Sequence, residues 1–404
     1  MDDVSPQFKS RPVDATLSRS RAGAKFIVAT PTRTVCDDNA RALEREGLLR
    51  FIALGTRRGT AGVPPEHTRL NPKIGLAVYA AYKLLPPFRS ESFYFRLQPW
   101  FDRWVKKQLQ AGDHIISSYG YVNECFAWTR KHGGKTFLDG GNSHPENFWT
   151  IISEEHRRWG YDRPPFAEHH YRRSVAMLEH VDYVLSPSSY VTRSFLARGF
   201  RQEQILKNVY PANLSLFKPD EKPRPKTRPL TLINTGSLSL RKGTPYLLES
   251  FRIIQKKVPG VRFFLTRLIQ DDIKHVLPRY SDLPIEWSPP LPHAQLAERL
   301  RSADIFVLPS LEEGLARTAC EAMACGLPTI LTAHTGANDF VKPGVSGEIV
   351  PIQDPQAIAD AVVKWAEIIM GPGYQPRTLV DPQLLSFEHF EKEFVGQLKE
   401  LTLA

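Results

Sequence analysis

Short apolar runs rich in β-branched residues alternate along the chain with longer segments in which apolar residues recur every three or four positions. The first pattern is typical of buried strands and the second of amphipathic helices. Strands are expected at Lys25–Ala29, Arg50–Ala53, His114–Ser117, Lys135–Leu138, Tyr183–Leu185, Leu230–Asn234, Val261–Thr266, Ile285–Trp287, Ile305–Leu308, Thr329–Leu331 and Glu348–Val350. Their alternation with helices predicts an α/β protein with two doubly wound parallel sheets.

A charged, proline-rich segment separates the two halves. Residues 217–229 hold four prolines, which neither a helix nor a central strand tolerates. A chain of 404 residues is also expected to form two domains. The predicted organisation is a flexible tail over 1–21, a first domain over 22–212, a linker over 213–229, a second domain over 230–380, and an amphipathic closing helix over 381–404.

The strongest chemical signal lies in Leu308–Pro328, where a buried strand turns through Gly314 into an Ala-rich helix. A glycine lets backbone approach a ligand closely, and the first amides of a helix attract an anion such as a diphosphate. Glu313 and Glu321 stand eight residues apart, ~12 Å along a helical axis. That spacing suits a sugar at one end of a diphosphate and a ribose at the other. By themselves, two such acids would more readily be surface residues of a packing helix.

A second motif, Thr235–Pro245, follows the first strand of the second half. It contains Gly236, Ser237, Arg241 and Lys242. Thr244 is expected to cap the next helix, with the proline in its first turn. The two cations then lie at the ligand edge of the sheet, where they could stabilise a leaving diphosphate without a metal. Isolated from this context, such a basic pair is mostly a solvated surface feature.

These motifs resemble the retaining glycosyltransferases of family 4, which have a Glu-x7-Glu motif and the GT-B fold of two Rossmann-like domains facing across a cleft. The resemblance covers about residues 180–360 and rests on Glu313-Gly314, Glu321–Pro328, Thr335–Asp339 and Gly344–Gly347. It implies that Glu313 contacts the donor sugar and that Glu321 binds the ribose hydroxyls. Backbone amides near Leu315 and Ala316 would contact the phosphates or sugar. Family members carry an arginine where this chain has Ser237, and Arg241 could substitute for it.

The first half is less explicit. Family members commonly present a histidine to the donor sugar, and His144, in a loop after a predicted strand, is the candidate. Capping of local backbone is the alternative. The family's Gly-rich first loop is missing, and an ordinary strand-to-helix turn is as compatible with this stretch as an acceptor site. Candidates for acceptor or phosphate contacts there are Thr32, Arg33 and Thr34.

The charge distribution bears on the partners. Residues 1–210 contain 31 Lys+Arg and 21 Asp+Glu, whereas the remainder contains 22 of each, so the first half carries all of the net charge of +10. Such a surface attracts membrane headgroups, phosphorylated lipid acceptors or acidic glycans, and a generally solvated basic surface is the alternative. Residues 71–104, rich in aromatic, leucine and basic side chains, could dock on a membrane or simply pack as helices. Nucleic acid is not an expected partner, since no known basic and aromatic module is visible.

Other features narrow the chemistry. The N-terminus has no apolar signal core and no stretch is long enough to span a bilayer, so a cytoplasmic protein, peripheral to the inner face of the membrane at most, is expected. The four cysteines are too irregularly spaced for a disulfide framework or a zinc site. Because the chain has no Asp-x-Asp carboxylate pair, we expect no metal, and no cofactor besides the nucleotide-sugar co-substrate.

The sequence therefore predicts a metal-independent, retaining glycosyltransferase of polysaccharide biosynthesis. It would transfer a hexose-type sugar from a nucleoside-diphosphate-sugar to a hydroxyl of a glycan or lipid-linked acceptor. The predicted catalytic residues are Glu313, His144 and Lys242. Two alternatives remain: a nucleotide-sugar epimerase on the same fold, whose product would still carry the nucleotide, and a non-catalytic glycan- or membrane-binding scaffold with a degenerate site.

Overall fold

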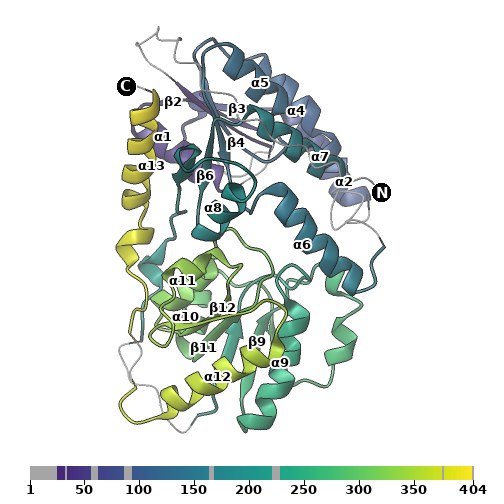
Figure 1. Cartoon of the computed structure of the whole chain (residues 1–404), viewed down its shortest axis with the longest axis vertical. Coiled ribbons are helices and arrows are strands. Elements are labelled where there is room, and N and C mark those ends of the chain that lie inside the picture. The colour runs from purple at the N-terminus through teal and green to yellow at the C-terminus, as the bar shows by residue number, and fades with distance from the viewer. Residues whose placement is uncertain are drawn as a thin grey trace.

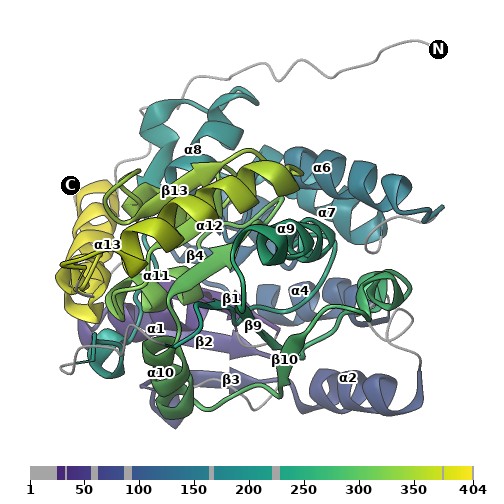
Figure 2. The same ribbon diagram turned by 90° about the horizontal axis from the view of Figure 1, so that it is seen from below.

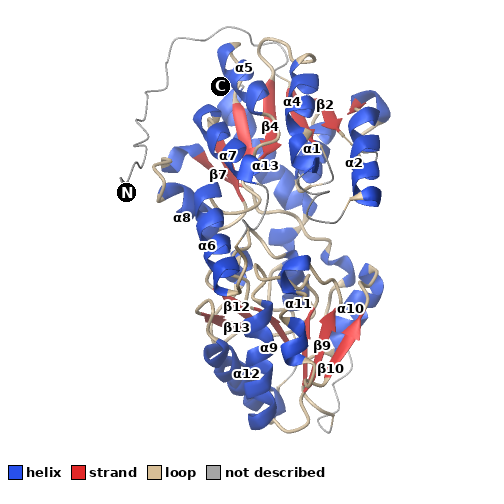
Figure 3. Cartoon of the chain, turned by 90° about the vertical axis from the view of Figure 1, so that its right-hand side faces the viewer, coloured by secondary structure: helices blue, strands red, loops and turns tan. Residues whose placement is uncertain are grey.

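Two parallel sheets, one from each half of the chain, form the framework of the molecule (Figure 1). The computed structural model describes residues 25–31, 34–55, 62–85, 93–162, 168–220, 228–374 and 377–402. Helices flank the strands of both sheets (Figure 3). The predicted α/β class and the arrangement of two Rossmann-like units in a GT-B fold are confirmed.

The first sheet has the strand order β3-β2-β1-β4-β5-β6-β7, and all of its pairs are parallel. Because the chain starts in the middle and winds toward both edges, loops diverge at the carboxyl ends of the central strands. The strands are β1 (Phe26–Thr30), β2 (Leu49–Leu54), β3 (Thr68–Leu70), β4 (His114–Ser118), β5 (Thr136–Asp139), β6 (Tyr183–Ser186) and β7 (Ile205–Lys207). The helices are α1 (Cys36–Arg45), α2 (Pro72–Leu84), α4 (Gln98–Lys106), α5 (Asn123–Lys131), α6 (Pro145–Arg158), α7 (Glu168–Met177) and α8 (Ser189–Leu196).

The second sheet repeats this plan with the order β10-β9-β8-β11-β12-β13. Its strands are β8 (Thr231–Asn234), β9 (Arg262–Thr266), β10 (Ile285–Ser288), β11 (Ile305–Leu308), β12 (Thr329–Thr332) and β13 (Gly347–Val350). The helices of this half and the tail are α9 (Thr244–Lys257), α10 (His293–Ser302), α11 (Arg317–Ala324), α12 (Pro355–Met370) and α13 (Phe387–Thr402). The buried Leu232, Val307 and Ile330 show why these apolar runs become central strands.

All the predicted strands are found within two residues of their expected bounds, whereas β3 and β7 went unpredicted. Both are three-residue edge strands with partly exposed side chains, so no apolar run marks them. One cap prediction was wrong. The cap of α9 is Gly243, in the left-handed region at φ 66°, where a Cβ would lie 2.0 Å from the Pro309 carbonyl oxygen. Thr244 is instead the first helical residue.

The C-terminal helix returns to the first unit, as predicted (Figure 1). Phe390, Phe394 and Leu398 on α13 are buried in the same core cluster as Leu43 of α1. The apolar side that the sequence pattern predicts for this helix thus packs against the other half of the molecule. The proposed domain bounds stay predictions, and the tail over 1–21 and linker residues 221–227 lie outside the described residues.

Helix α6 carries the first unit onto the second, and Figure 2 shows it beside α9. Its fully buried Glu155 accepts hydrogen bonds from the Tyr246 hydroxyl of α9 at 2.8 and 2.9 Å. Gln353, after β13, donates to the same carboxylate at 2.7 Å. Trp159, just after α6, donates its indole N–H to it at 2.7 Å. The two sheets are therefore held in a defined relation by buried polar contacts as well as by apolar packing.

Candidate active site

Two loops of the second unit place a pair of cations against an acid. The turn between β8 and α9 carries Arg241 and Lys242, and the loop after β11 carries Glu313. Arg241 Nη1 donates to Glu313 Oε2 at 3.0 Å, and Lys242 Nζ forms an ion pair with the same oxygen. Since parallel strands expose their carboxyl ends at one edge, residues about 70 positions apart meet there.

This arrangement fixes the charge of Glu313. Burial by itself would raise the pKa of its carboxyl, but the charges and hydrogen bonds of Lys242 and Arg241 lower it to about 2. Burial also lowers the pKa of Lys242, and Glu313 works against that shift. The side chains of Lys242 and Glu313 are only 13 and 15% exposed. The site therefore holds an ionised carboxylate bound to two cations, in a largely dry environment.

Glu321, on α11, has the opposite environment. Its side chain is buried, and no described residue donates a hydrogen bond to its Oε2. Burial raises the pKa of this carboxyl to about 7, and Arg317 opposes the shift only in part. Two further buried hydroxyls at the same sheet edge, Thr235 after β8 and Ser310 after β11, also lack a partner among the described residues. Unpartnered buried polar atoms are costly, and their gathering here indicates a site shaped for a polar ligand.

The segment between the two acids corrects one expectation. Helix α11 begins at Arg317, so Glu313–Ala316 is not helical and the spacing based on helical rise does not apply to it. Leu315 is buried and Ala316 is the N-cap, in an extended conformation. Gly314 lies directly against the other unit, because a Cβ on it would stand 2.0 Å from the carbonyl oxygen of Gly141. Its lack of a side chain is thus needed for contact between the units.

The remaining residues of the turn motif lie nearby. Gly236 donates its amide to Asn234 Oδ1 at 3.0 Å, just beyond the end of β8. A Cβ on Gly236 would stand 3.8 Å from Leu308, so the residue is close to β11. Ser237 is half-buried in the same turn. The expected exchange of roles between Ser237 and Arg241 stays a prediction.

His144 occupies a different setting from the one its catalytic role would need. It is the N-cap of α6, and its Nδ1 accepts the amide of Glu146 at 3.3 Å. The ring is 2% exposed and packs edge-on against Phe195. Burial lowers its pKa to about 4, so the ring is neutral near pH 7. His144 thus caps local backbone in the structure, as the alternative interpretation of the sequence has it. A catalytic role stays a prediction.

On the acceptor side, Thr32 and Arg33 lie outside the described residues. The Thr34 hydroxyl accepts the amide of Cys36 at 3.2 Å and contacts Thr30 at the same distance. Thr34 therefore stabilises the turn from β1 into α1 in this conformation. All four cysteines, including Cys36, are free and buried.

Sequence reasoning missed Glu312 and Arg317. Glu312 is fully buried, and its Oε1 accepts the amide of Ser143, in the other unit, at 2.8 Å. Arg317 forms an ion pair with Asp38 of α1, in the other unit, at 2.8 Å. The acid stands beside the conspicuous Glu313 and the cation inside an Ala-rich helix, so no local signal distinguished either. Only the packing of the two units against each other distinguishes these two residues.

Comparison with known proteins identifies the unit that holds the cluster. Residues 229–367 match the family described as glycosyl transferases group 1. This part of the chain is a glycosyl transferases group 1 domain.

Curated relatives match a little more than a third of the chain. The chain is 30% identical over 151 residues to the amylovoran biosynthesis glycosyltransferase AmsK of Erwinia amylovora, covering 35% of this chain and 37% of that protein. It is 28% identical over 173 residues to D-inositol 3-phosphate glycosyltransferase 1 of Catenulispora acidiphila, covering 38 and 41%. Matches to the first curated relatives span 37 to 44% of their length.

The whole fold has counterparts among solved structures. Sucrose-phosphate synthase from Thermosynechococcus elongatus superposes with a TM-score of 0.66 at 19% identity, covering 94% of this chain and 99% of that one. HepE from Anabaena, in complex with UDP and glucose, gives 0.62 at 14% identity and covers 93 and 100%. At such identities the likeness establishes the fold, here a group 1 domain joined to a first unit of the same general type.

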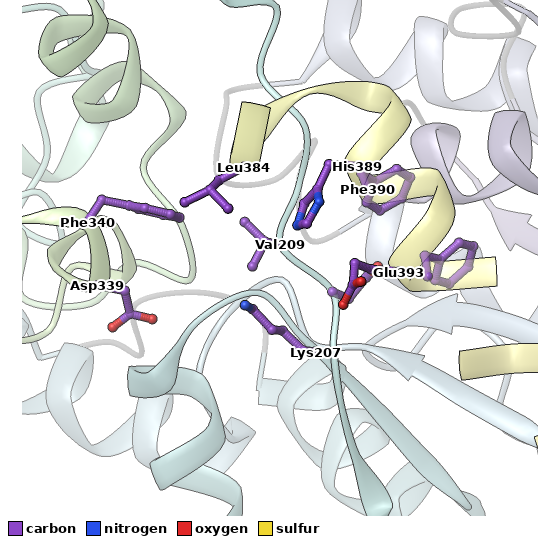
Figure 4. Close-up of a pocket in the computed structure, with 10 residues that line it drawn as sticks. Lys207, Val209, Asp339, Phe340, Leu384, His389, Phe390 and Glu393 are labelled. Atoms are coloured by element: carbon purple, nitrogen blue, oxygen red, sulfur yellow. The ribbon is translucent and has the colours of Figure 1, made fainter. Parts of the chain in front are cut away.

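A separate pocket of about 260 Å³ lies where the group 1 domain, the first unit and α13 meet (Figure 4). Its walls include Lys207, Val209, Asp339, Phe340, His389 and Glu393. None of the donor-site residues lines it. The pocket thus belongs to the junction between the units and not to the cluster around Glu313.

Two features are absent from the described residues. These residues contain no group of three or more His, Cys, Asp or Glu side chains arranged to hold a metal ion. No helix among them is long and apolar enough to cross a membrane. Independence from metal stays a prediction.

Proposed function

We propose that the protein is a retaining glycosyltransferase that takes a hexose-type sugar from a nucleoside-diphosphate-sugar and transfers it to a hydroxyl of a glycan or lipid-linked acceptor. The observation that carries this proposal is the cluster at the ligand edge of the group 1 domain. There, two cations face one carboxylate, and a second buried carboxylate has an unpartnered oxygen. Cations suit a diphosphate, and carboxylates suit sugar hydroxyls. The names of the relatives, which include glycosyltransferases of polysaccharide biosynthesis, support it.

In this proposal the donor replaces contacts that the protein makes within itself. The diphosphate binds Arg241 and Lys242, both of which form ion pairs with Glu313 in the structure. Glu313 is then released to accept hydrogen bonds from the sugar, and Glu321 accepts the ribose hydroxyls. The exchange keeps the two cations paired with an anion and gives both carboxylates hydrogen bonds, which a desolvated site requires.

The reaction would proceed on one face of the sugar. The bond between the anomeric carbon and the phosphate oxygen breaks, and the acceptor oxygen forms its bond on the same side. The leaving phosphate oxygen takes the acceptor proton, and Arg241 and Lys242 stabilise its charge. His144 would act only if the loop after β5 moved, since its ring is buried in the present conformation.

The acceptor would bind against the basic first unit, and we propose that this unit also contacts anionic membranes through α2. This helix contains no acidic residue, and its outer side exposes Leu76 by 69% and Tyr79 by 62%. Lys73 and Lys83 are exposed on the same helix. Aromatic and leucine side chains can enter the headgroup region while lysines meet lipid phosphates.

A panel of nucleotide-sugars tests the proposal. The productive donor should raise the melting temperature and release free nucleoside diphosphate when lipid or glycan extracts supply the acceptor. An epimerase would return the sugar still attached to its nucleotide. A scaffold would release nothing.

Two substitutions separate the proposed roles. Glu321→Ala should weaken binding of the nucleoside diphosphate about tenfold, because charge-assisted hydrogen bonds to the ribose are lost. Glu313→Ala should reduce turnover far more than binding, because its contacts are to the sugar. Calorimetric titration and nucleotide-release kinetics measure the two effects, and unchanged turnover in both variants would contradict the assignment.

A further inference from the structure

Glu312 is a residue of the group 1 domain whose side chain contacts the first unit. Its exposure is 0%, and its Oε1 accepts the amide of Ser143 at 2.8 Å. Tyr119 and Tyr190, both in the first unit, are close enough that its charge raises their pKa values in addition to the larger effect of burial. A carboxylate from one unit thus occupies a polar recess built by the other.

The recess is itself held in place. The Tyr119 hydroxyl donates to the carbonyl oxygen of Asn142 at 2.7 Å and lies 3.3 Å from that of Ser143. The recess therefore belongs to the loop between β5 and α6, which also supplies Gly141, the residue against which Gly314 packs. Two independent contacts, one polar and one steric, join this loop to the donor loop.

The other face of Glu312 points to the donor cations. Its Oε2 has no hydrogen-bond partner among the described residues and lies 3.7 Å from Arg241 Nη1. Arg241 also donates to the Glu312 backbone carbonyl at 2.8 Å. When Glu313 turns to a sugar, Glu312 cannot follow it, because Ser143 and burial retain its side chain. It is the acid of this pair that stays in place.

We propose that Glu312 is a positioning residue, the side chain by which the loop 140–144 of the first unit closes onto the donor loop. It binds no substrate atom. Its contact with Ser143 exists only while the units are together, so the contact stabilises the closed cleft against the open one. Its part in transfer rests on the proposed function, since closure matters for turnover only if the cleft is where transfer occurs.

The first test compares the purified full-length wild type with Glu312→Ala and Glu312→Gln, without ligand, by small-angle X-ray scattering. The alanine variant should be more extended than the wild type, because the bond to Ser143 is lost. The glutamine variant should be as compact as the wild type, because its amide oxygen still accepts the Ser143 amide and no charge is buried. Glu312→Met, which fills a similar space but has no acceptor oxygen, should be as extended as the alanine variant, whereas a residue that merely packs would be rescued by methionine.

Tyr119→Phe provides a second approach from the opposite unit. It leaves Glu312 intact but frees the loop carbonyls, so an increase in the radius of gyration smaller than that of Glu312→Ala is expected. An alanine variant and a Tyr119→Phe variant both as compact as the wild type would overturn the proposal. So would a glutamine variant as extended as the alanine variant.

UDP, GDP and ADP serve as binding probes in a calorimetric titration. The nucleotide that binds the wild type should bind Glu312→Ala within threefold of the same affinity, or more tightly, because a negative charge beside Arg241 has been removed. A loss of tenfold or more would make Glu312 a ligand-binding group and overturn the positioning role. Failure of all three nucleotides to bind the wild type would count against the proposed function alone, and the scattering comparison would still decide the role of Glu312.

Discussion

Two acids from one short motif have opposite electrostatic settings. Glu313 has a pKa of about 2 because Lys242 and Arg241 outweigh its burial. Glu321 has a pKa of about 7 because burial outweighs the single nearby cation of Arg317. The difference arises from partners supplied by a different loop, and not from the sequence around each acid. Titratable groups whose pKa values are shifted apart in this way are common at functional sites.

The pKa of Glu321 predicts a pH dependence of nucleotide binding. An ionised carboxylate accepts ribose hydroxyls best, so binding should lower this pKa and grow tighter as the pH rises through about 7. With the carboxyl largely protonated at pH 6, the affinity of the wild type for UDP should be roughly tenfold weaker there than at pH 8. Calorimetric titration at both values measures it.

Glu321→Gln is the control for this pH dependence, because UDP titrates near pH 6 in its own right. Any effect of the phosphate is common to both proteins. The extra dependence should therefore disappear in the glutamine variant, and an identical pH profile in the two proteins would exclude Glu321 as its source.

At the scale of single elements, α2 departs most from the usual pattern. A surface helix normally turns its polar side outward. Here Ile74 and Val78 enter the core of the first unit, and yet Leu76 and Tyr79 remain exposed on the outer side. Within the stretch from 71 to 104, α2 thus packs on one side and leaves apolar side chains exposed on the other, and membrane docking stays a proposal.

Replacing the exposed apolar side chains tests the membrane contact. Leu76→Glu with Tyr79→Glu should reduce co-flotation with vesicles that contain phosphatidylglycerol several-fold, because apolar insertion is lost and acidic groups face acidic lipid. Met370→Glu, on α12 of the group 1 domain, changes a side chain that is 63% exposed and should have no effect. Equal flotation of the double variant and the wild type would contradict a docking role for α2. Binding of the wild type only to vesicles of phosphatidylcholine would also contradict it.

At the scale of the whole molecule, the two units lie so close together at one contact that no side chain fits between them there. The donor cluster is largely sealed, since the Lys242 and Glu313 side chains are 13 and 15% exposed. In the proposed reaction, a nucleotide-sugar would enter while the units are further apart, and closure would then exclude water. Contacts such as that of Glu155 with Tyr246 join the two units in the present arrangement.

Gly314→Ala should block this closure. The φ angle of Gly314 is not in the left-handed region, so alanine suits the backbone, but its Cβ would meet the Gly141 carbonyl oxygen at 2.0 Å. We expect UDP affinity close to that of the wild type and turnover reduced about a hundredfold, since small misplacements of reacting groups are costly. Calorimetric titration measures the affinity, and nucleotide release measures the turnover.

Gly396→Ala is the matched control. Gly396 lies within α13, and a Cβ there would meet no atom within 4 Å. The variant should be more stable by about 0.5–1 kcal/mol, with unchanged turnover. Full activity in Gly314→Ala would show that the contact with Gly141 is not part of the reactive state.

The sequence by itself determined the central strands, the helix that buries Phe390 and Phe394, and the placement of Arg241, Lys242 and Glu313 at one edge of a sheet. These follow from local periodicity and from the rule that parallel strands end at a common edge. Edge strands β3 and β7 carry too few buried residues to give such a signal.

Only the tertiary structure decided that His144 caps α6, that Glu312 contacts the first unit, and that Gly314 is required by Gly141. The last two of these depend on groups more than 150 residues away in the chain, and a sequence pattern reports only on its neighbours. The tertiary structure also decided the two pKa values, because burial raises that of Glu321, whereas at Glu313 the charges of Lys242 and Arg241 outweigh burial.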